Sequence, residues 1–186
     1  TTCSDAVTME MRFEVHSYKA GAEFLFDNVS VRYLGDADDA NLGFETGENG
    51  EAPFNWTFYE RREKPNAPGE YEEGSFGAYT VKKVDGAAAD GVGAAAVVQK
   101  PETGMVQLYL QSAMIPVESN TSYLLSYDAM VRGNKKGSVI VCVRQFTDKL
   151  GNGTDDESVN FTWVPEANAY GSFDWRNCGA TFKTAP

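Results

Sequence analysis

The stretch TMEMRFEV, Thr8–Val15, decides the fold class of this chain. Every second side chain from Met9 onward is apolar, and the residues between them are glutamate or arginine. A period of two is that of a β-strand, because successive side chains point to opposite faces of a sheet. The stretch therefore predicts a strand with one face in a core and one polar face.

Similar runs continue along the chain, separated by turn sequences rich in Gly, Pro and Asn. Further strands are expected at residues 23–34, 92–99, 105–111, 123–131, 138–146, 158–164 and 180–184. Many short strands joined by Gly-containing turns are typical of all-β proteins. We therefore expect an all-β fold, namely a jelly-roll-like β-sandwich of two antiparallel sheets.

Length and charge narrow the class of protein. The 186 residues are 42% apolar and 12% aromatic, which suits one globular domain over residues 1–186. A net charge of −11 argues against nucleic acid or an anionic membrane surface as a partner, since both are polyanions. The sequence contains no run of 18 apolar residues, so it predicts no membrane-spanning helix. These properties suit a secreted or cell-surface protein.

The three cysteines have no metal-ligand spacing. Cys142 lies in an apolar run and is best interpreted as a small core residue. Cys3 and Cys178 lie in polar surroundings and could pair in an oxidising compartment. The sequence leaves this pairing open.

Several short motifs stand out along the chain: N-L-G-F-E at residues 41–45, P-F-N-W at 53–56, Q-S at 111–112, I-P-V at 115–117, Y-L-L-S-Y at 123–127, M-V-R-G at 130–133, T-F-K-T-A-P at 181–186 and F-D-N-V-S-V at 26–31. Taken together, they resemble the carbohydrate-binding modules of families 4, 9, 16 and 22. The resemblance covers nearly the whole chain and implies a β-sandwich that binds polysaccharide without cleaving it, as an accessory domain of a glycoside hydrolase.

The order of these motifs departs from that group. The phrase F-D-N-V-S-V normally belongs to the last strands, but here it stands near the beginning. Residues 1–34 would then supply the final two strands as a hairpin, residues 35–40 a linker, and residues 41–186 the body of one sandwich. The two strands could fill the gap within one molecule or in a strand-swapped neighbour, and the sequence does not decide between these.

One strand combines the groups that bind sugar. Val106, Leu108 and Leu110 alternate with Gln107, Tyr109 and Gln111, so the amides and the ring share one face. Sugars need flat aromatic surfaces for their C–H faces and fixed polar partners for their hydroxyls. A binding surface of Gln107, Tyr109 and Gln111 is the expectation, and an ordinary solvent-facing strand is the alternative.

The resemblance adds Trp56 and supports Gln111 as residues that contact the ligand. Trp56 could equally be a core residue, because aromatic side chains surround it in the sequence. Gln145 is a further, weaker candidate, although it shares parity with the apolar residues of its strand. Trp175 lies in an expected loop and is either a ligand contact or structural, whereas Trp163 is interpreted as a core residue.

The resemblance also implies a structural calcium ion. The matching residues are Asp27 and Glu45, with backbone carbonyls near residues 85–91 as companions. Carboxylate and carbonyl oxygens are ligands that Ca²⁺ prefers. Solvated or hydrogen-bonded acids are the alternative for these two residues.

Catalysis finds little support in the sequence. The one histidine, His16, ends a predicted strand without an evident nucleophile partner. Among 27 acidic residues, pairs are inevitable and therefore uninformative. We expect no enzyme activity; an adhesion or inter-domain structural sandwich without sugar binding is the alternative, followed by a small lyase or hydrolase.

Overall fold

The computed structural model describes residues 8–33, 44, 47–83, 88–89, 91, 93–101, 105–133, 136–147 and 160–186. Its elements are β1 (Thr8–Ser17), β2 (Glu23–Tyr33), β3 (Trp56–Glu63), β4 (Tyr71–Glu73), β5 (Gly77–Lys82), β6 (Ala94–Gln99), β7 (Val106–Ser112), β8 (Ile115–Pro116), β9 (Ser122–Arg132), β10 (Ser138–Phe146), β11 (Asn160–Trp163), the 3₁₀ helix η2 (Pro165–Ala167), β12 (Ala169–Tyr170) and β13 (Phe173–Lys183). In the described part of the chain, no helix is long and apolar enough to cross a membrane.

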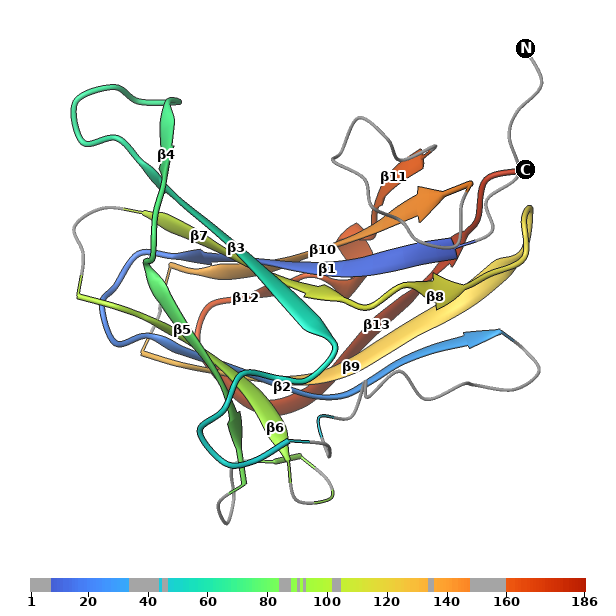
Figure 1. Ribbon diagram of the computed structural model, residues 1–186, viewed down its shortest axis with the longest axis horizontal. Helices are drawn as coiled ribbons and strands as arrows, with labels where there is room; N and C mark the ends of the chain where they lie inside the picture. Colours follow the sequence, from blue (N-terminus) through green and yellow to red (C-terminus); the bar gives the residue numbers. More distant parts are fainter. Residues whose placement is uncertain are drawn as a thin grey trace.

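The strands form two antiparallel sheets packed face to face (Figure 1). The eight-stranded sheet has the order β11-β10-β1-β7-β3-β4, with β12 beside β10 and β8 beside β1. The five-stranded sheet has the order β13-β9-β2-β6-β5. The all-β sandwich expected from the alternating pattern is confirmed.

The two N-terminal strands do not form the expected hairpin with each other. β1 lies between β10 and β7 in one sheet, and β2 lies between β9 and β6 in the other. Each strand carries an apolar face, and these faces meet across the core: the rings of Phe13 and Phe26 stack with centroids 4.9 Å apart. Burying both apolar faces against each other removes more apolar surface from water than a two-stranded hairpin would.

The N-terminal strands occupy interior positions of both sheets within this one chain. β1 has pairing partners over Thr8–His16 on one side and over Arg12–Ser17 on the other. The segment expected to be a linker, residues 35–40, lies outside the described residues.

An aromatic cluster fills the centre of the sandwich. Phe13 contacts Phe26, Tyr127 (centroids 4.8 Å apart) and Trp56 (6.1 Å), so rings from both sheets converge on one side chain. The Tyr127 hydroxyl reaches its partner by donating to the backbone oxygen of Ala167 at 2.5 Å. Aromatic pairs of this kind contribute about 0.5–1.5 kcal/mol each beyond the burial of their area.

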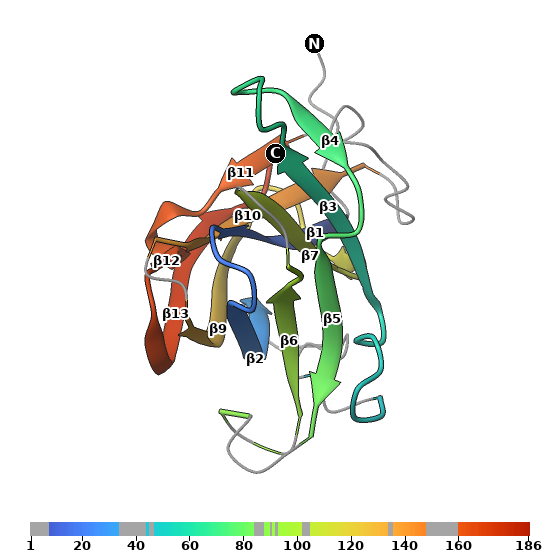
Figure 2. The ribbon, with the colours of Figure 1, turned by 90° about the vertical axis from the view of Figure 1, so that its left-hand side faces the viewer.

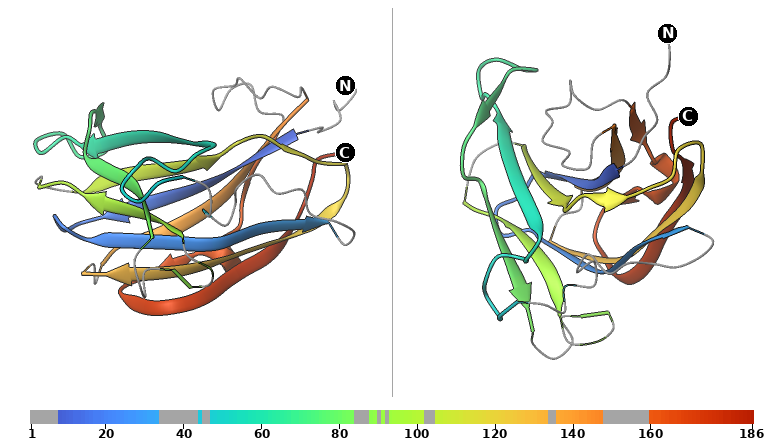
Figure 3. Two further views of the ribbon diagram at one scale, coloured as in Figure 1. Left: turned by 60° about the horizontal axis from the view of Figure 1, so that its bottom comes forward. Right: turned by 45° about the vertical axis from the view of Figure 1, so that its right-hand side comes forward.

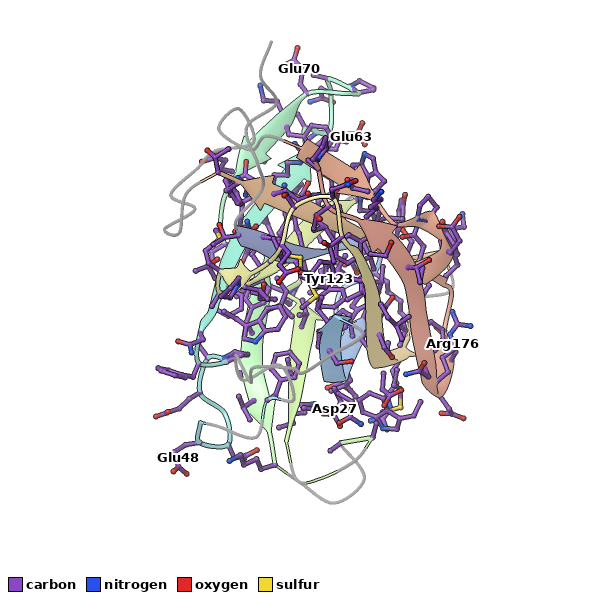
Figure 4. All side chains as sticks on the ribbon, turned by 90° about the vertical axis from the view of Figure 1, so that its right-hand side faces the viewer. Asp27, Glu48, Glu63, Glu70, Tyr123 and Arg176 are labelled. Atoms are coloured by element: carbon purple, nitrogen blue, oxygen red, sulfur yellow. The ribbon has the colours of Figure 1, made fainter. Side chains whose placement is uncertain are left out.

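The eight-stranded sheet is curved. Its two ends, β3–β4 and β11, bend away from the five-stranded sheet, so that its outer surface is concave (Figures 2 and 3). Figure 4 shows the side opposite to that of Figure 2. Glu63 and Glu70 lie at the β3–β4 end, whereas Asp27 and Arg176 lie on strands β2 and β13 of the five-stranded sheet. This curvature determines which surface could hold an extended ligand.

Candidate functional site

The concave side of the eight-stranded sheet, called the outer face below, is built by strand alternation. On β1, Met9, Met11, Phe13 and Val15 enter the core, and Glu10, Arg12, Glu14 and His16 point the other way. On β7 the core side chains are Val106, Leu108 and Leu110. Gln107, Tyr109 and Gln111 therefore share the outer face, as the sequence predicted.

Register aligns the outer face in three cross-strand rows, because directly paired residues point to the same side of a sheet. The first row, from β11 to β3, is Trp163, Cys142, Arg12, Gln111 and Thr57. The second, from β10 to β3, is Ile140, Glu14, Tyr109 and Tyr59. The third, from β12 to β4, is Tyr170, Ser138, His16, Gln107, Arg61 and Glu73.

The middle of the outer face, called its floor below, carries charged side chains that are nevertheless buried. Glu10 and Arg144 form an ion pair of 3.3 Å, with side chains only 8% and 5% exposed. Gln111 donates to the same carboxylate at 2.7 Å. Burial raises the pKa of Glu10, and the Gln111 hydrogen bond together with the charges of Arg144 and Arg12 opposes this rise without cancelling it.

Glu14 has a different environment on the same strand. His16 Nε2 lies 2.6 Å from its Oε1, and the Tyr109 hydroxyl lies 3.1 Å from that oxygen. Burial alone would raise the pKa of Glu14, but the hydrogen bond and charge of His16, with the Tyr109 hydrogen bond, bring the pKa below its ordinary value. The carboxylate of Glu14 is thus held ionised.

Tyr109 is covered, which corrects its expected role as an open platform. Its side chain lies within the outer face but is only 2% exposed. The Arg12 guanidinium lies over its ring at 4.4 Å, and the Tyr59 ring is 5.3 Å away. Burial raises the pKa of the Tyr109 hydroxyl, which is within hydrogen-bond distance of Glu14 and Gln107. Tyr109 therefore helps to fix the side chains of Glu14 and Gln107 in place, and its ring is not accessible to a sugar.

Gln107 and Gln111 differ in access. Gln107 is 5% exposed, and its Oε1 accepts a hydrogen bond from Arg61 Nε. Gln111 is half-buried beside Glu10. Of the two amides expected to contact the ligand, Gln111 is the one within reach.

Aromatic rings lie at the two edges of the outer face, and those at the β11–β12 edge are the more exposed. Trp163 is 49% exposed at the end of the first row, and Tyr170 is 63% exposed at the end of the third. Tyr59 and Tyr71 are half-buried on β3 and β4 at the opposite edge. The core interpretation of Trp163 is wrong, because pairing with Cys142 directs its side chain to the outer face.

Trp56 and Gln145 lie on the inner side of the sheet. Trp56 is 5% exposed and packs against Phe13 and Phe44, so the core alternative left open by the sequence is the one that the structure favours. Gln145 is fully buried, and its Oε1 accepts a hydrogen bond from Ala185 N at 2.6 Å. It ties the C-terminal end to β10 and is unavailable to a ligand on the outer face.

Trp175 belongs to the other sheet. It lies in β13, not in a loop, next to a register shift between Phe173 and Arg176. Its ring packs on a small cluster of Leu25, Ala96 and Met130. This cluster is separate from the main core and lies on the opposite side of the molecule from the outer face, so Trp175 does not join the candidate site.

The proposed calcium ligands are only partly described. Asp27 is fully buried, and its two carboxylate oxygens accept hydrogen bonds from Asn28 N and Ala89 N, both at 2.7 Å. Glu45 lies outside the described residues. Within the described part of the chain, no group of three or more His, Cys, Asp or Glu side chains could hold a metal ion. Calcium therefore stays a prediction.

Comparison of the chain with protein-family models, with curated proteins and with solved structures finds no match. The assignment of a function therefore depends on the geometry of the outer face. Sequence reasoning missed Trp163, Tyr170, Tyr59 and Arg61 as members of this face. The missing information was the register of β3, β11 and β12, which pattern alone does not supply.

Proposed function

We propose that this protein binds a polysaccharide across the outer face of the eight-stranded sheet and does not cleave it. The observation that carries this proposal is the combination of a concave sheet with exposed aromatic rings at the β11–β12 edge, half-buried rings at the β3–β4 edge, and hydrogen-bonded polar groups between them. Aromatic rings suit the apolar C–H faces of sugars, and amides and charged groups suit their hydroxyls.

The dimensions of the face suit an extended ligand. From β11 to β3 the path crosses β10, β1 and β7, and four inter-strand spacings of about 4.8 Å span roughly 19 Å. That length accommodates several sugar rings lying across the strands. An adhesion or structural sandwich would need no such arrangement of rings around a polar floor.

The polar floor also supports a binding role. Buried ion pairs such as Glu10–Arg144 contribute little to stability, because the loss of hydration offsets most of their attraction. Their value lies in holding polar atoms in fixed positions, which lowers the entropy cost of binding a flexible ligand.

Hydrolysis is the weaker alternative, favoured by one observation: the pKa values of Glu10 and Glu14 move in opposite directions. Glycosidase carboxyl groups lie about 5–9.5 Å apart with access to the substrate. Both carboxylates here are largely buried and engaged in hydrogen bonds within the protein, which supports a positioning role.

The test is binding of the purified protein to a panel of soluble polysaccharides, measured by calorimetry. We expect dissociation constants of roughly micromolar to millimolar. Trp163→Ala and Tyr170→Ala should each weaken binding about three- to tenfold, the loss expected for one aromatic contact. Leu124→Ala is the matched control, since Leu124 is 43% exposed on β9 in the other sheet and should leave affinity unchanged.

Two results would contradict the proposal. One is unchanged affinity in both aromatic variants with a loss in Leu124→Ala, which would move the site to the other sheet. The second is the release of new reducing ends or unsaturated sugars by pure protein, which would identify an enzyme.

A further inference from the structure

Arg61 is held rigidly on the outer face. Its guanidinium lies over the Tyr71 ring, 4.4 Å from the centroid, and 5.6 Å from the centroid of the Tyr109 ring. Its Nε donates a hydrogen bond to Gln107 Oε1. Contacts from β4 and β7 thus fix a side chain of β3 that would otherwise sample many rotamers.

Within the described part of the chain, no neighbour neutralises the charge of Arg61. Arg144 has Glu10 at 3.3 Å, and His16 has Glu14 at 2.6 Å. In contrast, no carboxylate among the described residues lies within ion-pair distance of Arg61.

The nearest acid in register is already engaged. Glu73 lies directly opposite Arg61 on β4, and its Oε1 accepts a hydrogen bond from the Tyr59 hydroxyl at 2.9 Å. The terminal nitrogens of Arg61, Nη1 and Nη2, donate to no described protein atom, and the side chain is half-buried. Among the described residues, a fixed guanidinium therefore presents two unpaired terminal nitrogens, with four N–H donors, on the outer face.

We propose that Arg61 binds the carboxylate of a uronic acid in the polysaccharide. This inference rests on the proposed function and names the class of glycan. The paired Nη donors match the two oxygens of a planar carboxylate, which gives a bidentate, charge-assisted contact. Contacts with Gln107 and with the rings of Tyr71 and Tyr109 hold the guanidinium of Arg61 in a fixed orientation in the unliganded protein.

The charge of the whole protein restricts how many uronates the ligand carries. With a net charge of −11, the protein as a whole would repel a chain that is acidic at every sugar, even though Glu10 and Glu14 are paired with Arg144 and His16 on the outer face. One carboxylate per several neutral sugars avoids this repulsion and still reaches Arg61. The ligand is thus a neutral backbone with sparse uronic acid groups.

The experiment compares two forms of one polymer. The affinity of the whole protein is measured for a neutral-backbone polysaccharide with uronic acid side groups. It is measured again after the carboxyl groups of the polymer have been chemically reduced to alcohols. We expect about tenfold weaker binding of the reduced polymer, as for loss of one partly exposed charge-assisted contact.

Variants of Arg61 test whether the difference in affinity between the two polymers depends on this residue. Arg61→Gln should bind both polymers equally, at the affinity of wild type for the reduced form. Arg61→Lys should recover part of the difference, because it keeps the charge and loses the fork. Arg62→Gln is the matched control: Arg62 points to the other side of β3 and pairs with Glu72, so the preference for the acidic polymer should persist. Melting curves confirm that each variant is folded.

The outcomes separate the two proposals. Equal binding of both polymers by wild type overturns the uronate assignment and leaves polysaccharide binding intact. No binding of either polymer, or of any in the panel, overturns both. A sulfated neutral polysaccharide that binds as tightly through Arg61 would replace the uronate with a general anion and also overturn the assignment.

Discussion

Glu10 and Glu14 are identical side chains on one face of β1, and their neighbours move their pKa values in opposite directions. For Glu10, burial outweighs the favourable contacts and raises the pKa. For Glu14, the contacts with His16 and Tyr109 outweigh burial and lower the pKa. The difference comes from the neighbours of each carboxyl group: His16, two residues further along β1, lies 2.6 Å from Glu14, and the Tyr109 hydroxyl reaches Glu14 from β7.

Glu14 should therefore stabilise the fold in a defined pH range. A carboxyl whose folded pKa is lowered contributes stability above its unfolded pKa, about 4.3, and loses it as pH falls through the folded pKa. Glu14→Gln should be about 1.5–3 kcal/mol less stable than wild type at pH 6, the range for hydrogen bonds to charged groups. The gap should narrow at pH 3. Urea denaturation at both pH values measures it.

Glu10→Gln provides a control of the opposite sign. The folded pKa of Glu10 is raised, so the unfolded chain loses this proton first, and the contribution of Glu10 to stability falls as pH rises above about 4.3. Relative to Glu10→Gln, wild type should lose stability over that range. Parallel pH dependence of the two variants would contradict both assignments.

Alternation predicted which residues share the outer face but not which are accessible. Gln107, Tyr109 and Gln111 point outward as expected, because side-chain parity is a local property of a strand. Tyr109 is covered by Arg12 and by neighbours on β3, and that burial depends on pairing between segments distant in sequence. Access to a site is therefore not readable from the pattern of one strand.

At the scale of elements, most of the strands were predicted, whereas β3, β4, β5, β8 and β12 were missed. The predicted strands that lie within two residues of their expected bounds are β1, β2, β6, β7, β9, β10 and β11. β3 was missed because its sequence, WTFYERRE, ends in charged residues and lacks a period of two. β13 begins at Phe173, before the expected residue 180, since its first half pairs through a register shift.

Gly179 determines how closely β13 approaches β9. A Cβ added there would lie 2.5 Å from the backbone oxygen of Leu125 and 3.1 Å from the Cα of Ser126, and backbone atoms cannot move aside cheaply. Gly179→Ala should destabilise the protein by about 1–3 kcal/mol. Thermal unfolding measures the loss. Thr181→Ala, at an exposed position of the same strand, is the control and should stay within about 0.5 kcal/mol of wild type.

A Gly179→Ala protein as stable as wild type would show that β13 can shift without cost. The same variant should leave polysaccharide affinity unchanged, because β13 belongs to the sheet opposite the outer face. Loss of affinity without loss of stability would place the ligand on the five-stranded sheet and contradict binding at the outer face.

At the scale of the molecule, the order of the strands along the chain can be separated from their arrangement in space. The first two strands lie inside both sheets, between elements from the middle and the end of the chain. The end of the chain also lies near the start of β1: Ala185 N is bonded to Gln145, and Gln145 pairs directly with Met9. Motif order suggested that residues 1–34 complete the sandwich, but it did not reveal that they divide between the sheets.

Deleting residues 1–34 should therefore prevent folding. The remainder would lack a central strand in each sheet, and with it Phe13 and Phe26 from the aromatic centre of the core. Unpaired strand edges on β7, β10, β6 and β9 would be exposed, and such edges associate with other chains. We expect an insoluble or molten product that lacks near-ultraviolet circular dichroism and binds hydrophobic dye.

A circular permutant is the matched control for this deletion. Its chain would start at residue 41, run to Pro186, continue into residues 1–34 and end there, so that every described strand is kept. Residues 1–7 can span up to about 23 Å at roughly 3.3 Å per residue, which suffices for the join because Ala185 and Met9 both neighbour Gln145. The permutant should be a folded monomer that binds polysaccharide like wild type. A folded deletion protein, or a permutant that is folded only as a dimer, would contradict closure of the sandwich within one chain.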